Sequence, residues 1–271
     1  SLLGGLASTV FIPLVAWMVQ HVGWRQAVEV LALLQLLLCL PLHAMLLHAP
    51  DTPNAARPRV APPPSAELKQ LLRSAPYLLV CAFVILMTTV SAALPIHLVS
   101  MLHSFQLDES WAVIVPASMG VFQVASRLLL YFVEKRLDVH LANRVIPMLM
   151  PLGLLMLLVA SAVAPAIAVG FALGFVALFG MGNGMLTIVK GTAIAQYVSP
   201  THVASLNGAM GIPLALARAC APLALAALWS TTWGYSLGLG ALLLLSIMGV
   251  GALWLAQKSS GAHNASFPSS H

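Results

Sequence analysis

Eight apolar stretches, each close to the roughly twenty residues that a helix needs to cross a bilayer, fill most of this chain of 271 residues. Hydrophobic residues make up 60% of the sequence and charged residues only 7%, which excludes an ordinary water-soluble domain. Lipid offers no hydrogen-bond partner to an open backbone, so such stretches cross it as helices. The sequence therefore predicts an all-α polytopic membrane protein with eight transmembrane helices, at residues 4–20, 27–48, 76–99, 110–132, 145–164, 166–189, 204–228 and 235–256.

The basic residues fall almost entirely on alternate connections between these stretches. One side holds Arg57, Arg59, Lys69, Arg73, Lys135, Arg136, Arg144, Lys190 and Lys258. The opposite side holds only Arg25. Because Lys and Arg stay in the cytoplasm during insertion, the crowded side is predicted to be cytoplasmic, together with both chain ends. We expect a multi-pass protein of the cell membrane, of bacterial inner membrane type. The net charge of +5 then reflects topology and not nucleic-acid binding.

A proline-rich segment divides the chain. Residues 50–64 contain six prolines and two arginines, a composition typical of a semi-rigid linker. We predict two helices in residues 1–49, a cytoplasmic linker at 50–72, a six-helix bundle at 73–258 and a disordered cytoplasmic tail at 259–271. Because the first apolar stretch begins almost at the first residue, we expect the initial helices of the first unit to be missing from this sequence.

Polar residues are unevenly distributed among the stretches. The second, fifth and eighth are almost purely apolar and can face lipid, whereas the third, fourth, sixth and seventh carry amides, hydroxyls, prolines and charges. Polar groups in a membrane turn toward partners or water. A recurrence every three helices is typical of transporters built from repeated units.

Within each polar stretch these residues share one helical face at 100° per residue. The four faces predict one water-filled cavity lined by Thr88, Ser91, Gln123, Asn183, Thr187, Asn207 and Arg218. Glycines on the same helices have another explanation, because small residues four apart let helices approach closely in lipid. We assign the pairs Gly170/Gly174 and Gly180/Gly184 to helix packing.

Arg218 is the most informative single residue. It lies fourteen residues after the cytoplasmic start of its stretch, roughly 20 Å deep at 1.5 Å per residue. A cation at that depth is costly unless it meets water, an acid, backbone carbonyls or an anion. One hypothesis is that Arg218 binds an anionic group of a substrate, such as a carboxylate, through paired hydrogen bonds. The alternative is a structural arginine bonded to carbonyls of a neighbouring helix.

Several classes of function are disfavoured. Cys39, Cys81 and Cys220 are isolated, and the nine histidines show no metal-ligand spacing, so no cofactor or metal is expected. The sequence lacks a phosphate-binding loop and the signatures of intramembrane hydrolases, which argues against an enzyme. The stretches after residue 73 contain no Asp or Glu between their end positions. Coupling to a proton or other ion through a carboxylate would therefore use other parts of the protein.

Four segments resemble the major facilitator superfamily of transporters. Gly23–Ala27 (GWRQA) is similar to its fifth-to-sixth helix hairpin, and Ser126–Arg136 (SRLLLYFVEKR) to its repeated cytoplasmic motif. Gly182–Thr187 (GNGMLT) is similar to its tenth helix, and Leu206–Gly208 with Arg218 and Pro222 to its eleventh. The cytoplasmic motif departs from the family pattern, with Glu134 in place of an aspartate and aromatic residues in place of glycines.

This resemblance implies helices five to twelve of a twelve-helix fold made of two bundles that rock about a central site. It implies secondary active transport of a small solute, such as an organic anion or a drug-like molecule, by alternating access. It also implies a cytoplasmic gate at Arg127, Glu134 and Arg136, although positive-inside anchoring explains the same basic residues. The alternative function is a non-transporting membrane sensor or scaffold on the same fold.

Overall fold

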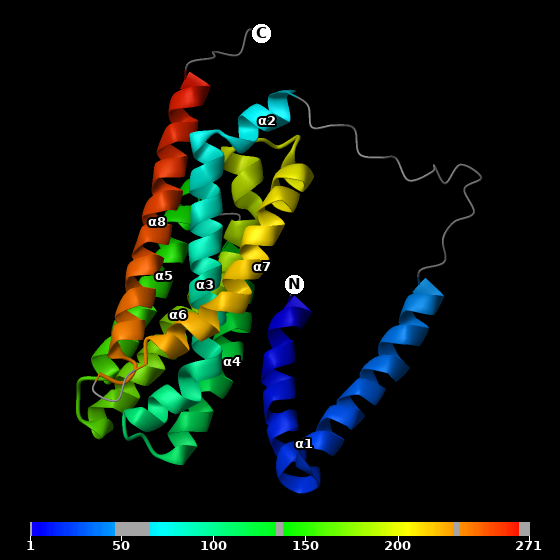
Figure 1. Ribbon diagram of the computed structural model, residues 1–271, viewed down its shortest axis with the longest axis vertical. Coiled ribbons are helices and arrows are strands. Elements are labelled where there is room, and N and C mark those ends of the chain that lie inside the picture. The colour runs from blue at the N-terminus through cyan, green and yellow to red at the C-terminus, as the bar shows by residue number, and fades with distance from the viewer. Residues whose placement is uncertain (1, 47–65, 134–137, 230–232, 266–271) are drawn as a thin grey trace.

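The computed structural model describes the chain outside residues 1, 47–65, 134–137, 230–232 and 266–271. All regular structure in the described ranges is helical (Figure 1). The helices are α1 (Leu2–Leu46), α2 (Ala66–Leu72), α3 (Ala75–Ser104), α4 (Glu109–Val133), α5 (Val139–Ala160), α6 (Pro165–Tyr197), α7 (Val203–Ala227) and α8 (Ser236–Ala265).

Helix α1 consists of two arms that meet at Gly23 (Figure 1). Gly23 has φ 80° and ψ 161°, a conformation that glycine adopts readily because it has no Cβ. The turn falls inside the segment Gly23–Ala27 that the sequence places between its first two apolar stretches. The arms are therefore separate helices joined by a sharp reversal.

Seven described helices are long and apolar enough to cross a membrane, and they make this a multi-pass membrane protein. They are His21–Met45, Ala75–Ser104, Glu109–Phe132, His140–Ala160, Pro165–Tyr197, Val203–Ala227 and Ser236–Ser259. The remaining predicted span, residues 4–20, is helical within the first arm of α1 but is not among the seven. Most of its side chains lie outside the described part of the chain.

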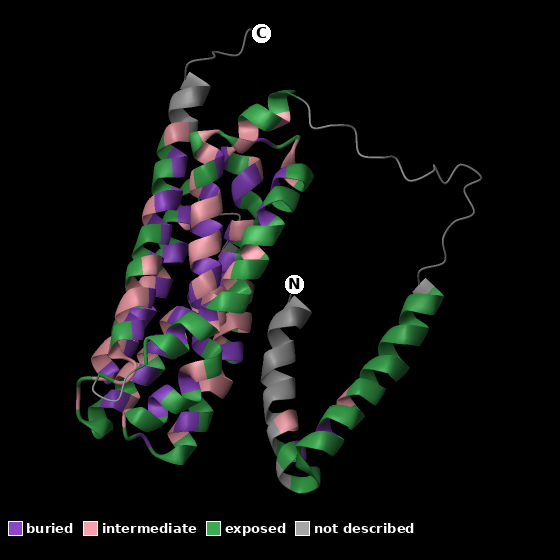
Figure 2. Cartoon of the chain, in the orientation of Figure 1, coloured by how far each residue is buried: buried purple, intermediate pink, exposed green. Residues whose placement is uncertain are grey.

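Helices α3 to α8 form a bundle in which α3 packs on α4, α6, α7 and α8, while α5 packs on α6 and α8. The largest buried side chains include Phe83, Met87, Phe175 and Phe179, which fill the centre of this bundle. Exposed residues follow the outward faces of the helices (Figure 2). Helix α1 contacts the bundle through α4. Its second arm exposes a run of large apolar side chains, the surface that a hydrocarbon environment accommodates.

Glycines allow α6 to approach two neighbours closely. Two of these contacts are with α4. A Cβ at Gly184 would lie 2.6 Å from the carbonyl oxygen of Gln123, and a Cβ at Gly180 would lie 3.0 Å from Cβ of Phe122. A Cβ at Gly182 would lie 2.9 Å from Cβ of Leu149 on α5. The predicted packing role thus fits Gly180/Gly184. A packing role does not fit Gly170, because a Cβ at this residue would meet no atom within 4 Å.

Two helices extend further than hydropathy indicates. Helix α6 continues to Tyr197, beyond the apolar stretch that was expected to end at residue 189. Helix α8 continues to Ala265, into the segment 259–271 predicted as a disordered tail, because adding one residue to an existing helix gains a backbone hydrogen bond. Within the predicted linker 50–72, residues Ala66–Leu72 form the short helix α2.

Candidate functional site

We name five polar side chains on three helices the polar cluster: Thr88 and Ser91 on α3 and Asn183 and Lys190 on α6, which are buried or half-buried, and Arg218 on α7, which is exposed. The Ser91 hydroxyl lies 2.9 Å from Oδ1 of Asn183 and 2.8 Å from the carbonyl of Met87, so it shares its proton between two acceptors. The contact with Asn183 joins α3 to α6 in the middle of both helices, and the contact with Met87 lies within α3. The sequence predicted all members except Lys190 as cavity residues.

Lys190 occupies a different position from the one expected. The sequence places it at the end of its span as a topology signal, whereas α6 carries it inside the helix and half-buried. Its Nζ donates to Oγ1 of the buried Thr88 at 3.3 Å. The signal that identifies it is its position on the stripe of Gly180, Asn183 and Thr187. A membrane helix can continue past the end of its apolar stretch at a lysine, because the apolar stem of the side chain packs along the helix while the ammonium reaches a polar partner.

Arg218 lies on the exposed side of α7, fifteen residues after Val203, roughly 22 Å along the helix at 1.5 Å per residue. Among the described residues, no hydrogen-bond or ion-pair partner faces its guanidinium. Its helix and the helix that carries Lys190 both pack against α3. The carbonyl-bonded alternative therefore finds no support in the described part of the chain.

No carboxylate compensates these two charges in the spans of the bundle. The described acids of residues 66–265 are all at helix ends or in connections: Glu67, Asp108, Glu109 and Asp138. Within the described residues no group of His, Cys, Asp and Glu is arranged to hold a metal ion. The polar cluster thus carries two positive charges and several hydrogen-bond donors. This arrangement is suited to an anion.

The other predicted cavity residues lie around this cluster. Thr187 is exposed on α6 and donates its hydroxyl proton to the carbonyl of Gly184 at 2.9 Å. Gln123 is half-buried where α4 crosses α6, with its backbone beside Gly184. Asn207 is exposed near the start of α7, next to Leu206, whose carbonyl accepts a 3.0 Å hydrogen bond from the Tyr77 hydroxyl. The described contacts do not join Gln123 or Asn207 directly to the cluster.

Of the three predicted gate residues, only Arg127 is described. Its Nε donates to the carbonyl of Gly184 on α6 at 3.1 Å, which pins α4 to α6. Glu134 and Arg136 lie outside the described residues. Arg127 therefore has at least one contact that holds two helices together, made to the backbone of a neighbouring helix.

The order of these helices and motifs agrees with a comparison to protein families. The family model described as Major Facilitator Superfamily matches residues 1–222, which is most of the chain and includes the whole polar cluster. This chain belongs to the Major Facilitator Superfamily. No curated protein matches it. Superfamily members are transporters and generally not enzymes, so membership implies secondary transport of a small solute across a lipid bilayer.

A second polar network, which no sequence pattern predicted, lies where α5, α6 and α8 of this superfamily member meet. Asn143 Nδ2 lies 2.7 Å from both the Tyr197 hydroxyl and Gln196 Oε1. Gln257 donates to the same tyrosine oxygen at 3.2 Å and accepts from Arg144 Nε at 3.0 Å. Asn143, Tyr197 and Gln257 are buried, so this network connects three helix ends through satisfied polar groups.

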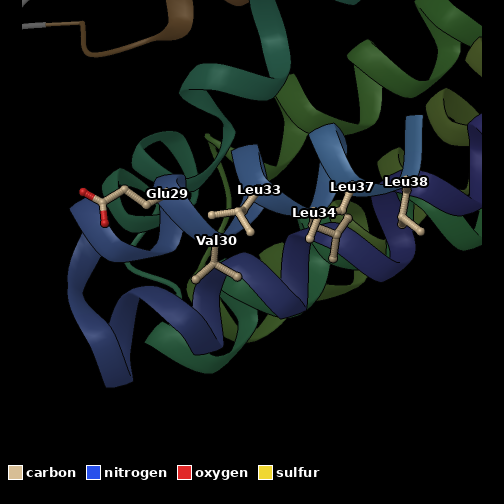
Figure 3. A pocket seen from close by; sticks show the side chains of 6 residues that line it. All are labelled: Glu29, Val30, Leu33, Leu34, Leu37 and Leu38. Atoms are coloured by element: carbon tan, nitrogen blue, oxygen red, sulfur yellow. The ribbon is translucent and has the colours of Figure 1, made fainter. Parts of the chain in front are cut away.

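An apolar groove lies along the second arm of α1 (Figure 3). It measures about 530 Å³ and is lined by Glu29, Val30, Leu33, Leu34, Leu37 and Leu38. None of these residues belongs to the polar cluster, and five of the six are aliphatic. The groove is a surface for hydrocarbon contact, and the polar cluster remains the candidate site for a solute.

Proposed function

We propose that the protein transports a small organic anion by alternating access, with Arg218 as the principal contact for the anionic group. The observation that carries this proposal is the exposed guanidinium of Arg218, on a helix that packs against α3, without a carboxylate in the surrounding spans. A cation inside a membrane costs about 3 kcal/mol on insertion scales, so it persists where it has a role. Arginine binds carboxylates through two parallel hydrogen bonds, which gives both affinity and orientation.

The contrast between two arginines supports this assignment. Arg127 donates to a backbone carbonyl of the neighbouring helix. Arg218 has no comparable partner among the described residues, although α7 packs along α3. A transported anion supplies the partner during part of the cycle and leaves water in its place during the rest.

Helix α7 is also able to deform near this residue. Pro213 and Pro222 lie inside the helix on either side of Arg218. Each proline removes one backbone hydrogen bond and weakens the helix locally, and the bond that Pro222 removes is the one to the carbonyl of Arg218 itself. A helix that carries the anion contact and bends at both sides of it suits a site that opens alternately to two compartments.

The remaining organisation of the proposal follows the sequence. Eight spans place both ends in the cytoplasm of a bacterial cell, and residues 73–258 form one bundle that moves against the other through the linker at 50–72. Arg127, Glu134 and Arg136 form the cytoplasmic gate. Movement is driven by a gradient of protons or another ion.

The proposal is tested with the protein reconstituted in liposomes and supplied with radiolabelled organic anions, with drug-like cations and neutral compounds as further solutes, with and without a protonophore. We expect gradient-dependent uptake of at least one organic anion. Arg218→Ala should lower kcat/KM about 100-fold, the scale of a lost charge-assisted hydrogen-bond pair, and Arg218→Lys should lower it less. Lys258→Gln removes an exposed cation elsewhere and is the matched control.

Two results would contradict the proposal. Unchanged affinity in both Arg218 variants would remove the ligand role of this residue. Absence of gradient-driven flux for every anion tested would favour a non-transporting sensor or scaffold instead.

A further inference from the structure

We infer that the transported anion carries two negative charges, one bound by Arg218 and one by Lys190, and that Thr88 positions the Lys190 ammonium for this contact. The inference rests on the proposed function and narrows its substrate class to dianions, whose charges are on carboxylate or phosphate oxygens. It also adds Lys190 to the substrate contacts and Thr88 as a positioning residue.

The balance of charge in the polar cluster is the first argument. Lys190 and Arg218 lie on two helices that both pack against α3, and the spans around them contain no acidic side chain. A monoanion would compensate only one of these two positive charges, whereas a dianion compensates both.

The balance of hydrogen bonds is the second argument. Lys190 donates one of its three ammonium protons to the hydroxyl of Thr88. Asn183 accepts from Ser91 through Oδ1, which leaves both Nδ2 protons without a partner among the described residues. Thr187 directs its own proton into its helix. The cluster thus presents an excess of donors, and its ligand must be rich in acceptor oxygens.

The position of Lys190 is the third argument. A lysine that serves only as a topology signal extends its ammonium toward the aqueous interface. Lys190 instead bonds to a buried hydroxyl on α3, the helix that packs against both α6 and α7. This bond restricts a flexible side chain to the side of the bundle where Arg218 lies, and so lowers the entropy cost of holding a second anionic group.

The experiment measures competition against the uptake of a labelled organic anion in liposomes containing the protein. The competitors have matched carbon skeletons and differ in charge: a monocarboxylate, a dicarboxylate and a phosphate monoester. We expect a dianion to bind at least about tenfold more tightly than the monocarboxylate, the scale of one additional charge-assisted hydrogen bond. The last two competitors distinguish carboxylate from phosphate as the source of the second charge.

Three variants separate substrate binding from structure. Lys190→Gln should abolish the preference for the dianion over the monocarboxylate, and Lys190→Arg should restore the preference because it restores the charge. Thr88→Val is nearly isosteric and should raise KM for the dianion without changing kcat. Lys258→Gln should change none of these values, and thermal unfolding in detergent confirms that each variant is folded.

The outcomes distinguish this inference from the proposed function. Equal affinities for monoanion and dianion, with uptake intact, would overturn the inference alone. Survival of the dianion preference in Lys190→Gln would overturn it too. A complete lack of anion uptake would contradict the proposed function, and the inference with it.

Discussion

The Ser91 hydroxyl on α3 and the Asn183 amide on α6 are joined by a 2.9 Å hydrogen bond at the centre of the bundle. The bond holds Oδ1 of Asn183 against α3. The two Nδ2 protons of Asn183 have no hydrogen-bond partner among the described residues. Lys190, two turns further along α6, is held to α3 by Thr88 in the same way. Two bonds between the same helices therefore orient both α6 donors, and each can be removed separately.

Ser91→Ala should raise KM for the transported solute several-fold with little loss of stability. The variant frees the Asn183 side chain to rotate, while a hydrogen bond between membrane helices contributes only about 0.6 kcal/mol on average. Transport kinetics and thermal unfolding in detergent measure the two effects. Ser118→Ala is the matched control, because the Ser118 hydroxyl bonds to Val115 within its own helix. Equal changes in the two variants would show that Ser91 has no role in orientation.

Gly184→Ala should destabilise the bundle by about 2 kcal/mol or more, because overfilled interfaces typically cost about 1–3 kcal/mol. The new Cβ would lie 2.6 Å from the backbone oxygen of Gln123, which cannot move without shifting α4. The shift would also disturb the Arg127 bond to the Gly184 carbonyl. Gly170→Ala on the same helix is the control, since its surroundings are open and alanine favours helix. Similar unfolding temperatures for both variants would contradict this account of α4–α6 packing.

The sequence predicts those parts of the site that depend on periodicity. Thr88, Ser91, Asn183 and Arg218 fall on polar stripes, and a stripe in a membrane helix must face other helices or water. The family follows from motif order and is confirmed by the family match. Helix existence follows from the apolar stretches, although the first of the eight is not confirmed as a span.

Periodicity within one helix does not predict which polar residues form hydrogen bonds between helices. Lys190 follows the last residue of an apolar stretch, and hydropathy alone assigns it to the interface. Only the position of α3 reveals that its ammonium bonds to Thr88. Asn143, Tyr197 and Gln257 lie near the ends of three different helices, where polar residues are ordinary. Their network depends on how α5, α6 and α8 converge, which no periodicity within one helix encodes.

Tyr197→Phe tests the importance of that network. The tyrosine oxygen contacts Asn143 Nδ2 at 2.7 Å and Gln257 Nε2 at 3.2 Å, so its removal takes a partner from two buried amides. We expect a loss of stability of about 1–3 kcal/mol, because unsatisfied buried donors cost more than the bond itself contributes. Tyr131→Phe is the control, since Tyr131 is exposed near the end of α4. Thermal unfolding of both variants measures the difference, and a Tyr197 variant as stable as its control would show that the network is not stabilising.

Cysteine labelling tests whether the polar stripes share a water-filled cavity. In a background with Cys39, Cys81 and Cys220 replaced by serine, single cysteines at Gln123, Asn183, Asn207 and Arg218 should react with a membrane-impermeant thiol reagent. The thiolate is the reactive form, and it requires water to form. Leu244→Cys on α8 is the control, because this side chain is 59% exposed on an apolar helix and should face lipid, where the thiol stays protonated. A transported anion should slow labelling at Asn183 and leave labelling at Asn207 less affected, because Asn183 belongs to the polar cluster and Asn207 does not. Shielding of all four positions in every condition would mean that these stripes face other helices and enclose no cavity.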